Sequence, residues 1–425
     1  MSKLTGFKQL AFGMALSALC TAAMADIVFY STQARPLEEA QKMRDEVLAG
    51  FDGTVQFSPQ EDGSFFTRIE AEQQADEVTL GLLGALHGQF PPIDSALEAL
   101  DDLVPALAER NISPTFMTLG KLGTEQQLYI PWMQATYIMA ANKDALQYLP
   151  EGADINALTY AQLAAWGQAM HEAAGEPKLG FPAGPKGLMH RFLQGYLYPS
   201  FTDSVVSDFR SEKAETMWAS FKDLWQYVNP RSTAYNFMQE PLLAGEVWVA
   251  FDHTARLKEA FDQQPDQFIA FPAPAGPEGR GFMPVVAGLG IPKGTPDRAS
   301  SASLIDYLTQ PATQIKTLRA IGFYPVVQVE LPDDLPPNVK IAGPAVSAQA
   351  NAADANPSLL PVGLGDQSGL FNKIYQDTFQ QIVLRNADIK QILDRQAQAL
   401  KRIITKTGAP CWAPDQPSDG PCPVN

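Results

Sequence analysis

The sequence predicts an α/β protein with two or three lobes. Apolar segments typical of strands alternate along the chain with segments whose apolar residues recur at helical spacing. The length of 425 residues exceeds what a single hydrophobic core usually organises. A hydrophobic fraction of 45% with only 18% charged residues excludes a disordered chain, while 34 prolines and 31 glycines predict many loops.

Residues 1–25 have the pattern of a cleavable secretory signal peptide. Lys3 and Lys8 form a basic start, and residues 10–23 are mostly apolar. Ala23 and Ala25 occupy the −3 and −1 positions of a cleavage site. A membrane anchor is the alternative, but the run is shorter than the roughly 20 residues that span a bilayer. Cleavage leaves 29 basic and 47 acidic residues, a balance of −18. We therefore expect a secreted, periplasmic protein.

Cleavage also removes Cys20, so that Cys411 and Cys422 remain. An even pair in an exported chain predicts a disulfide, which would stabilise the fold by roughly 3 kcal/mol by closing a short loop. Two free thiols are the alternative. The surrounding Pro-rich residues show no periodicity, so we expect residues 409–425 to form a disulfide-stapled tail. Leu19 argues against lipid attachment at Cys20, because lipoprotein signals carry a small residue there.

The first part of the mature chain predicts a parallel sheet. We expect strands at residues 27–30, 54–57 and 78–86, and helices at residues 36–49 and 65–74. This alternation indicates a parallel sheet covered by helices. Ligands of such sheets bind beyond the carboxyl ends of the strands. Those ends are residues 31–35, 59–64 and 84–88.

The middle of the chain repeats the alternation and predicts a second lobe. The expected strands are residues 128–132, 135–139 and 247–251, and the expected helices are residues 160–174 and 213–228. Trp166, Trp218 and Trp225 stand at helical spacing and are expected in the core. A stretch rich in proline and glycine follows, over residues 271–294. No repeat of fixed period occurs, which excludes solenoids and propellers.

Several short motifs follow one another in a characteristic order. They are Tyr129-Ile130-Pro131-Trp132 with Tyr137-Ile138-Met139-Ala140-Ala141-Asn142-Lys143-Asp144, then Pro241-Leu242-Leu243-Ala244-Gly245-Glu246-Val247-Trp248, Gly288-Leu289-Gly290-Ile291-Pro292-Lys293-Gly294 and Gly322-Phe323-Tyr324-Pro325-Val326. Behind a signal peptide, this order resembles the extracellular solute-binding proteins of carbohydrate ABC transporters, family 1, which include maltose-binding protein. Glu246-Val247-Trp248 departs from the family's commoner Lys-Ala-Ala, and the cysteine tail is not shared with maltose-binding protein.

The resemblance implies a periplasmic binding protein-like II fold, in which two discontinuous α/β lobes are joined by a hinge with a ligand cleft between them. The expected N-terminal lobe comprises residues 26–135 and 287–330, and the C-terminal lobe residues 136–286 and 331–408. The chain would cross between the lobes near residues 133–137, 284–287 and 326–331.

The resemblance also implies a function. The protein would be the periplasmic substrate-binding component of an ABC importer, binding a sugar or oligosaccharide between its lobes and delivering it to permease subunits in the inner membrane. We expect a monomer without a cofactor, a bound metal or a nucleic-acid partner. The excess of acidic residues independently argues against nucleic-acid binding, which requires Lys and Arg at phosphates.

Sugar recognition calls for polar groups that meet hydroxyls and for aromatic planes that meet C–H faces. From the first lobe we select Gln33, Arg35, Glu61, Asp62, Phe65 and His87. From the second lobe we select His190, Arg191, Asp252, His253 and Arg256, with Asp252-His253 as the strongest pair. The aromatic candidates are Trp132, Tyr235, Tyr324 and Phe371. Trp132 could instead fill the core at the hinge, and Tyr324 could pack there.

Other chemistries find less support. The four histidines lack the short spacing of a zinc site, and no Walker sequence occurs. A secreted carbohydrate-active enzyme is the alternative function; Gln239-Glu240-Pro241 faintly resembles a glycosidase acid/base segment, but a second carboxylate at a defined separation is required. A phosphorylated ligand is disfavoured, because the candidates mix acids with bases.

Overall fold

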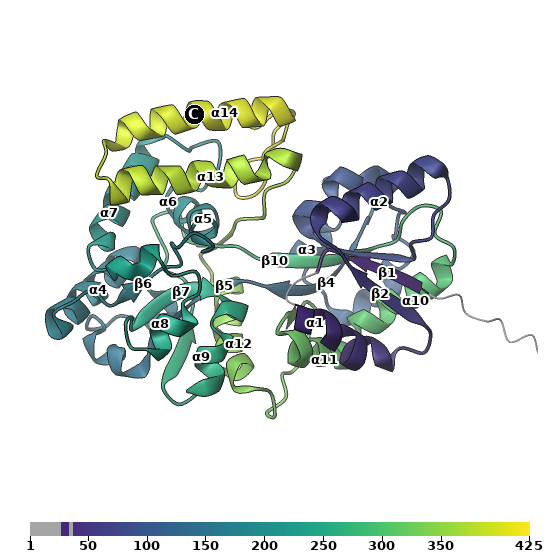
Figure 1. Ribbon diagram of the computed structural model, residues 1–425, viewed down its shortest axis with the longest axis horizontal. Coiled ribbons are helices and arrows are strands. Elements are labelled where there is room, and N and C mark those ends of the chain that lie inside the picture. Colours follow the sequence, from purple (N-terminus) through teal and green to yellow (C-terminus); the bar gives the residue numbers. More distant parts are fainter. Residues whose placement is uncertain (1–26, 34–36) are drawn as a thin grey trace, which may run out of the picture.

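The computed structural model describes residues 27–33 and 37–425. The predicted signal peptide, Cys20 and the candidate Arg35 lie outside these residues. Figure 1 shows two bodies of mixed helices and strands that are connected by extended strands. The predicted α/β class with two lobes is confirmed.

The N-lobe, on the right in Figure 1, is built on a six-stranded sheet in the order β11-β4-β10-β3-β1-β2. Its strands are β1 (Ile27–Ser31), β2 (Val55–Pro59), β3 (Leu82–Leu86), β4 (Ile130–Ala135), β10 (Val285–Gly290) and β11 (Tyr324–Pro325). Its helices are α1 (Leu37–Lys42), α2 (Asp62–Ala75), α3 (Pro114–Leu119), α10 (Arg298–Thr309) and α11 (Pro311–Ile321). β1 runs parallel to both β2 and β3, as the sequence predicts.

The C-lobe, on the left, contains a four-stranded sheet in the order β6-β7-β5-β8 and the pair β12-β9. Its strands are β5 (Tyr137–Asn142), β6 (Leu179–Gly180), β7 (Val249–His253), β8 (Phe268–Phe271), β9 (Arg280–Phe282) and β12 (Ala355–Pro357). Its helices are α4 (Tyr160–Ala174), α5 (Met189–Phe192), α6 (Tyr198–Thr202), α7 (Glu212–Trp225), α8 (Gln239–Leu243), α9 (Lys258–Gln263), α12 (Pro337–Ala350), α13 (Ser368–Phe379) and α14 (Ile389–Thr407).

Several predicted elements are shifted by two or three residues at an end, and two differ for identifiable local reasons. The strand expected over residues 78–86 begins only at Leu82, because the main-chain N–H groups of Thr79 and Leu80 donate to the Glu72 carboxylate at 2.8 and 3.3 Å. The helix expected over residues 36–49 is α1 followed by a π-helical turn, Met43–Val47, and a short 3₁₀ turn.

The sequence reading missed strand β10, which lies inside the stretch rich in proline and glycine. The strand is buried along its whole length between β3 and β4. Gly288 is required there, because a Cβ at this position would overlap the ring of Tyr129. Glycine therefore marks a close approach to a neighbouring side chain rather than a loop.

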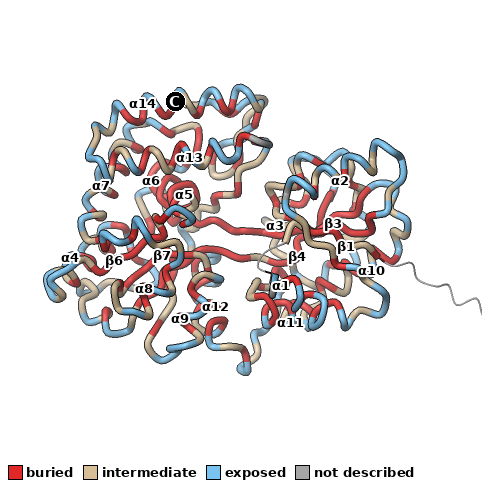
Figure 2. Tube along the Cα trace, viewed as in Figure 1, coloured by how far each residue is buried: buried red, intermediate tan, exposed pale blue. Residues whose placement is uncertain are grey.

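The lobes are connected by strands that are buried where they cross, as Figure 2 shows. Only Thr136 separates the end of β4 from the start of β5. Its hydroxyl donates to the main-chain carbonyl of Met283, just before β10, at 3.0 Å. The amide of Gln349 on α12 donates to the same Thr136 hydroxyl at 3.3 Å and to the carbonyl of Tyr137 at 3.0 Å. Two crossing segments and one C-lobe helix thus meet at a single residue.

Each lobe has its own hydrophobic core. In the N-lobe, buried clusters include Phe29 and Leu83. In the C-lobe, the largest cluster includes Trp166 and Trp218, with Trp225 packed against it, as expected. Along the part of the chain that the structure describes, no helix combines the length and apolar character needed to cross a bilayer.

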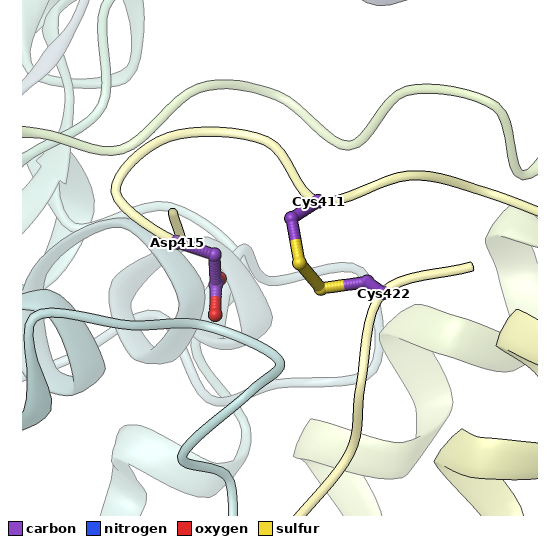
Figure 3. A group of neighbouring side chains, drawn as sticks. All are labelled: Cys411, Asp415 and Cys422. Atoms are coloured by element: carbon purple, nitrogen blue, oxygen red, sulfur yellow. A yellow bond between two sulfur atoms is a disulfide. The ribbon is translucent and has the colours of Figure 1, made fainter. Parts of the chain in front are cut away.

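The C-terminal tail is closed on itself by a disulfide and attached to the C-lobe by a buried carboxylate, both shown in Figure 3. The predicted disulfide between Cys411 and Cys422 is present. Asp415, which is 4% exposed, points from the tail toward residues 204–207. Its carboxylate accepts hydrogen bonds from three main-chain N–H groups and two serine hydroxyls of that segment, at 2.6–3.0 Å. The carboxylate is therefore satisfied without a metal ion, and the two nearby sulfurs are bonded to each other.

We expect Asp415→Ala to lower the free energy of unfolding by about 2–4 kcal/mol, because five donors lose a charged acceptor and the N–H groups stay buried. Asp419→Ala, which removes an exposed carboxylate from the same tail, should change the stability by less than about 0.5 kcal/mol. Denaturant unfolding of both variants measures the difference. Equal stabilities would show that Asp415 does not anchor the tail.

Candidate ligand-binding cleft

The register of the two sheets brings two sets of strand ends to the hinge. In the N-lobe, β10 starts at the crossing and pairs Ala287 with Leu86, so the carboxyl end of β3 lies beside the hinge, with those of β1 and β2 parallel to it. In the C-lobe, β5 starts at the crossing and pairs Tyr137 with His253, so β7 also ends there, with β6 parallel to it. The loops that follow these strands therefore face each other between the lobes.

Two cavities open between the lobes on either side of Tyr324. One, of about 410 Å³, is lined by Lys42 of the N-lobe and by Thr254 and Lys258 of the C-lobe, among others. The other, of about 810 Å³, lies between the region of α3 and α12. Tyr324 is 6% exposed and lines both. Apart from Tyr324, the predicted site residues line neither of these two cavities.

The lobes also touch at the carboxyl end of β3. A Cβ added to Gly88 would lie 2.8 Å from the main-chain oxygen of Pro361, in the C-lobe segment before α13. Glycine at this position allows the two backbones to approach. The contact places the loop after β3 directly against the opposite lobe.

The N-lobe strand ends are held together by Gln89. Its side-chain oxygen accepts hydrogen bonds from the Thr32 hydroxyl at 2.7 Å and from the Leu86 N–H at 2.8 Å, which connects the ends of β1 and β3. His87 is buried beside them, with Nδ1 2.9 Å from the hydroxyl of Tyr129. Burial lowers the pKa of His87 to about 4, so the imidazole is neutral at physiological pH.

The other N-lobe candidates have different surroundings. Phe65 is fully buried and its ring stacks on Tyr30 at 5.3 Å, so it belongs to the core and not to the cleft surface. Glu61 is exposed and stands at the N-terminus of α2, whereas Asp62 begins the helix with a side chain outside the described atoms. Gln33 follows β1, and its side-chain oxygen is buried without a hydrogen-bond partner among the described residues.

Asp252 joins the end of β7 to the loop before α8 and has a structural role. It is fully buried, and its two oxygens accept from the N–H groups of Met238 at 2.9 Å and His253 at 2.8 Å. Burial raises its pKa to about 7, against the opposing effects of Arg256 and these hydrogen bonds. The selection of Asp252 as a ligand contact is not supported, because both oxygens point into the protein at backbone donors.

His253 and His190 are less buried than Asp252, and both imidazoles are neutral. His253 packs edge-on against Tyr137 at 5.0 Å, and its Nδ1 accepts from the Ala255 N–H, which leaves Nε2 as the protonated donor. The Nδ1 of His190 lies 3.4 Å from the side-chain amide nitrogen of Gln376. Burial, with help from nearby arginines, lowers the pKa of His253 to about 4 and that of His190 to about 3.

Arg191 and Arg256 complete the C-lobe group. Arg191 lies on α5, and its Nη1 donates to the side-chain oxygen of Gln194 at 3.3 Å. Arg256 donates to the main-chain oxygen of Asn236 at 3.1 Å, and its guanidinium lies over the ring of Phe237 at 4.6 Å. The loops after β6 and β7 and the loop before α8 are thereby joined.

Three aromatic candidates are engaged inside their lobes. Trp132 is fully buried in the N-lobe core beside Phe29, the alternative that the sequence left open. Phe371 is fully buried against Trp412 of the tail. The hydroxyl of Tyr235 donates to the carboxylate of Glu246. These three side chains are not brought together with the candidates at the strand ends, which are His87, His190, Arg191, His253 and Arg256.

The sequence reading missed four residues that accompany the strand ends. They are Thr32, Gln89, Tyr137 and Phe237. Tyr137 could have been found from its place directly after the predicted crossing, and Gln89 from its position two residues after His87. Phe237, an exposed aromatic residue on a loop, carries no signal in sequence alone.

Comparisons with known proteins agree with this architecture. Residues 42–342 match the family described as "Bacterial extracellular solute-binding protein". No curated protein matches the chain. Among solved structures, the sugar-binding protein MalE from Xanthomonas citri has a TM-score of 0.69 at 16% identity, covering 90% of this chain and 98% of its own.

Two further structures have the same fold. Maltose-bound MalE3 of T. maritima has a TM-score of 0.67 at 17% identity, with 89% of this chain and 99% of its own covered. UgpB from Mycobacterium tuberculosis, in complex with glycerophosphocholine, has a TM-score of 0.67 at 17% identity, with 90% and 99% covered. The protein belongs to the bacterial extracellular solute-binding proteins. The class of protein predicted from the sequence is confirmed.

We expect the stability of the protein to fall as the pH drops from about 6.5 to 4. Over this range the unfolded chain binds protons at His87, His190 and His253, whereas the folded chain does not, so the free energy of unfolding decreases. Asp252 acts in the opposite direction between pH 3.8 and about 7, but three histidines outweigh it. Denaturant unfolding at several pH values measures the slope.

The matched variants are His190→Gln, which should flatten this slope, and His171→Gln. His171 lies on α4, away from the strand ends, and its replacement is the control. A slope that is the same in the wild type and in His190→Gln would show that His190 is not held neutral by the fold.

Proposed function

We propose that this protein is the periplasmic substrate-binding component of an ABC importer, which binds a sugar or oligosaccharide between its lobes and delivers it to inner-membrane permease subunits. The family match supports binding and release rather than turnover. The observation that carries the proposal is the meeting of two sets of polar strand ends at the hinge. Binding of maltose by the structurally similar MalE3 supports a saccharide ligand.

The strand-end side chains have the chemistry that sugars require. Hydroxyl groups of a sugar both donate and accept, and the Thr32 hydroxyl, the Gln89 amide and the neutral His253 offer both kinds of group. Phe237, which is 38% exposed, supplies an aromatic ring for the apolar face of the sugar. Phe237 replaces the buried Trp132 and Phe371 as the proposed aromatic contact.

The connection between the lobes permits closure around a ligand. The chain passes from one sheet to the other at Thr136 and again before β10, so small backbone rotations at these points would move one lobe against the other. The proposed closed, ligand-bound form is the state presented to the permease. We propose that the protein acts as a monomer, exported by the predicted signal peptide.

The proposal predicts binding without turnover. Incubation of the mature protein with a panel of mono- and oligosaccharides should raise the melting temperature with at least one compound, because a ligand that binds the folded state stabilises it. Chromatography should recover that compound intact. Its hydrolysis would instead support the alternative of a secreted carbohydrate-active enzyme.

We expect Phe237→Ala to weaken binding of the identified sugar by about tenfold, through loss of ring stacking, while the melting temperature of the free protein changes little. Leu384→Ala is the control, because Leu384 is a similarly exposed apolar residue that lies after α13 and outside the strand-end loops. Calorimetric titration measures both affinities. Equal losses in the two variants would remove Phe237 from the site.

A further inference from the structure

Two arginines at the C-lobe strand ends carry positive charge without a matching acid. The polar contact of Arg191 is with the neutral amide of Gln194, and the contacts of Arg256 are with main-chain carbonyls. Among residues 27–33 and 37–425, neither guanidinium forms an ion pair. Other arginines of the chain, such as Arg298, pair directly with carboxylates.

Asp252 compensates this charge only in part. Its charge acts on Arg256, but both of its oxygens are occupied by the N–H groups of Met238 and His253. Burial lowers the pKa of Arg191, and Tyr137 is the neighbour that opposes this shift, so no carboxylate supports the Arg191 charge. Arg191 is therefore a partly buried cation with spare donors.

The neighbouring histidines neither cancel nor increase this charge. Burial, followed by the positive charges of Arg191 and Arg256, keeps the pKa of His190 near 3. His253 is kept neutral by burial and by Arg256. The nearby arginines thus add to the effect of burial on both pKa values, and both imidazoles remain neutral hydrogen-bonding groups at physiological pH.

The facing strand ends of the N-lobe supply mostly neutral groups. Their described polar side chains are Thr32, Gln33, Gln60, Glu61, His87 and Gln89. Of these, Glu61 is the charged one at neutral pH, and it is exposed. The described part of the site is therefore cationic on the C-lobe side and largely neutral on the N-lobe side, in a chain whose formal net charge is −16.

We propose that the solute carries an anionic oxygen group, a carboxylate or a phosphate, which Arg191 binds with support from Arg256. This inference rests on the proposed function and narrows its ligand to acidic or phosphorylated saccharides. The planar guanidinium presents paired N–H donors that match two oxygens of such a group. The mixture of acids and bases among the predicted site residues had disfavoured an anionic ligand. In the structure Asp252 is fully buried, which separates this acid from the two arginines that would meet the ligand.

The test compares matched neutral and anionic solutes on the full mature protein. One set is glucose, glucuronate and glucose 6-phosphate, and a second is maltotriose and trigalacturonate. Thermal shift followed by calorimetric titration should find an anionic member that binds at least about tenfold more tightly than its neutral counterpart. Tighter binding of glucuronate or trigalacturonate would identify a carboxylate as the anionic group, and tighter binding of glucose 6-phosphate would identify a phosphate. Binding should weaken with added salt.

Variants assign the effect to Arg191. Arg191→Gln should weaken the anionic solute by about 10- to 100-fold and leave any neutral solute less affected, and Arg191→Lys should restore part of the loss. Arg256→Gln should give a smaller loss. Arg385→Gln removes one positive charge from an exposed position after α13 and should change nothing. Circular dichroism and melting temperatures establish that each variant is folded.

The outcomes separate this inference from the proposed function. A neutral sugar that binds as tightly as its anionic partner, with no loss in Arg191→Gln, would overturn the anion site and uphold sugar binding. Inorganic phosphate that binds as tightly as glucose 6-phosphate, with no saccharide dependence, would uphold the anion site and overturn the sugar. No binding of any solute in either set would count against both.

Discussion

The arrangement of the site depends on the near-continuity of two strands through the hinge. Because Thr136 alone separates β4 from β5, the two sheets begin their pairing from the same point in space. The register of β10 with β3 and of β5 with β7 then places the carboxyl ends of β1–β3 and of β6 and β7 beside that point. The hydrogen bond from Thr136 to the carbonyl of Met283 ties the second crossing segment to the first. The loops of the proposed site are therefore positioned by backbone pairing and not by their side chains.

The sequence was sufficient for elements with strong periodicity and insufficient for the direction of individual side chains. The helix over residues 160–174 is observed with those bounds, and the parallel order of β1–β3 follows the predicted alternation. Strand β10 was not predicted because its Gly288 is required by the ring of Tyr129, a contact between residues far apart in the chain. Asp252 and His253 are adjacent in sequence, yet alternation along β7 turns one inward to backbone donors and the other toward the crossing.

The two buried carboxylates of the described residues hold the structure together. Asp415 and Asp252 are both buried and both accept main-chain N–H groups, one to hold the tail and one to hold the loops beside the cleft. Neither is available to a ligand. Because the oxygens of Asp252 accept from main-chain N–H groups, this nearby acid forms no ion pair with Arg191 or Arg256 among the described residues.

An acidic protein that binds an anion must overcome repulsion at a distance, and the range of the charges decides whether it can. At physiological ionic strength the screening length is about 8 Å, so surface charges spread over the two lobes contribute little at the hinge. Arg191 and Arg256 act at contact distance and in a partly desolvated environment, where electrostatic interactions are screened less. The net charge of −16 thus affects long-range attraction and solubility, whereas in the proposed site the two arginines would act on a solute only after it has entered.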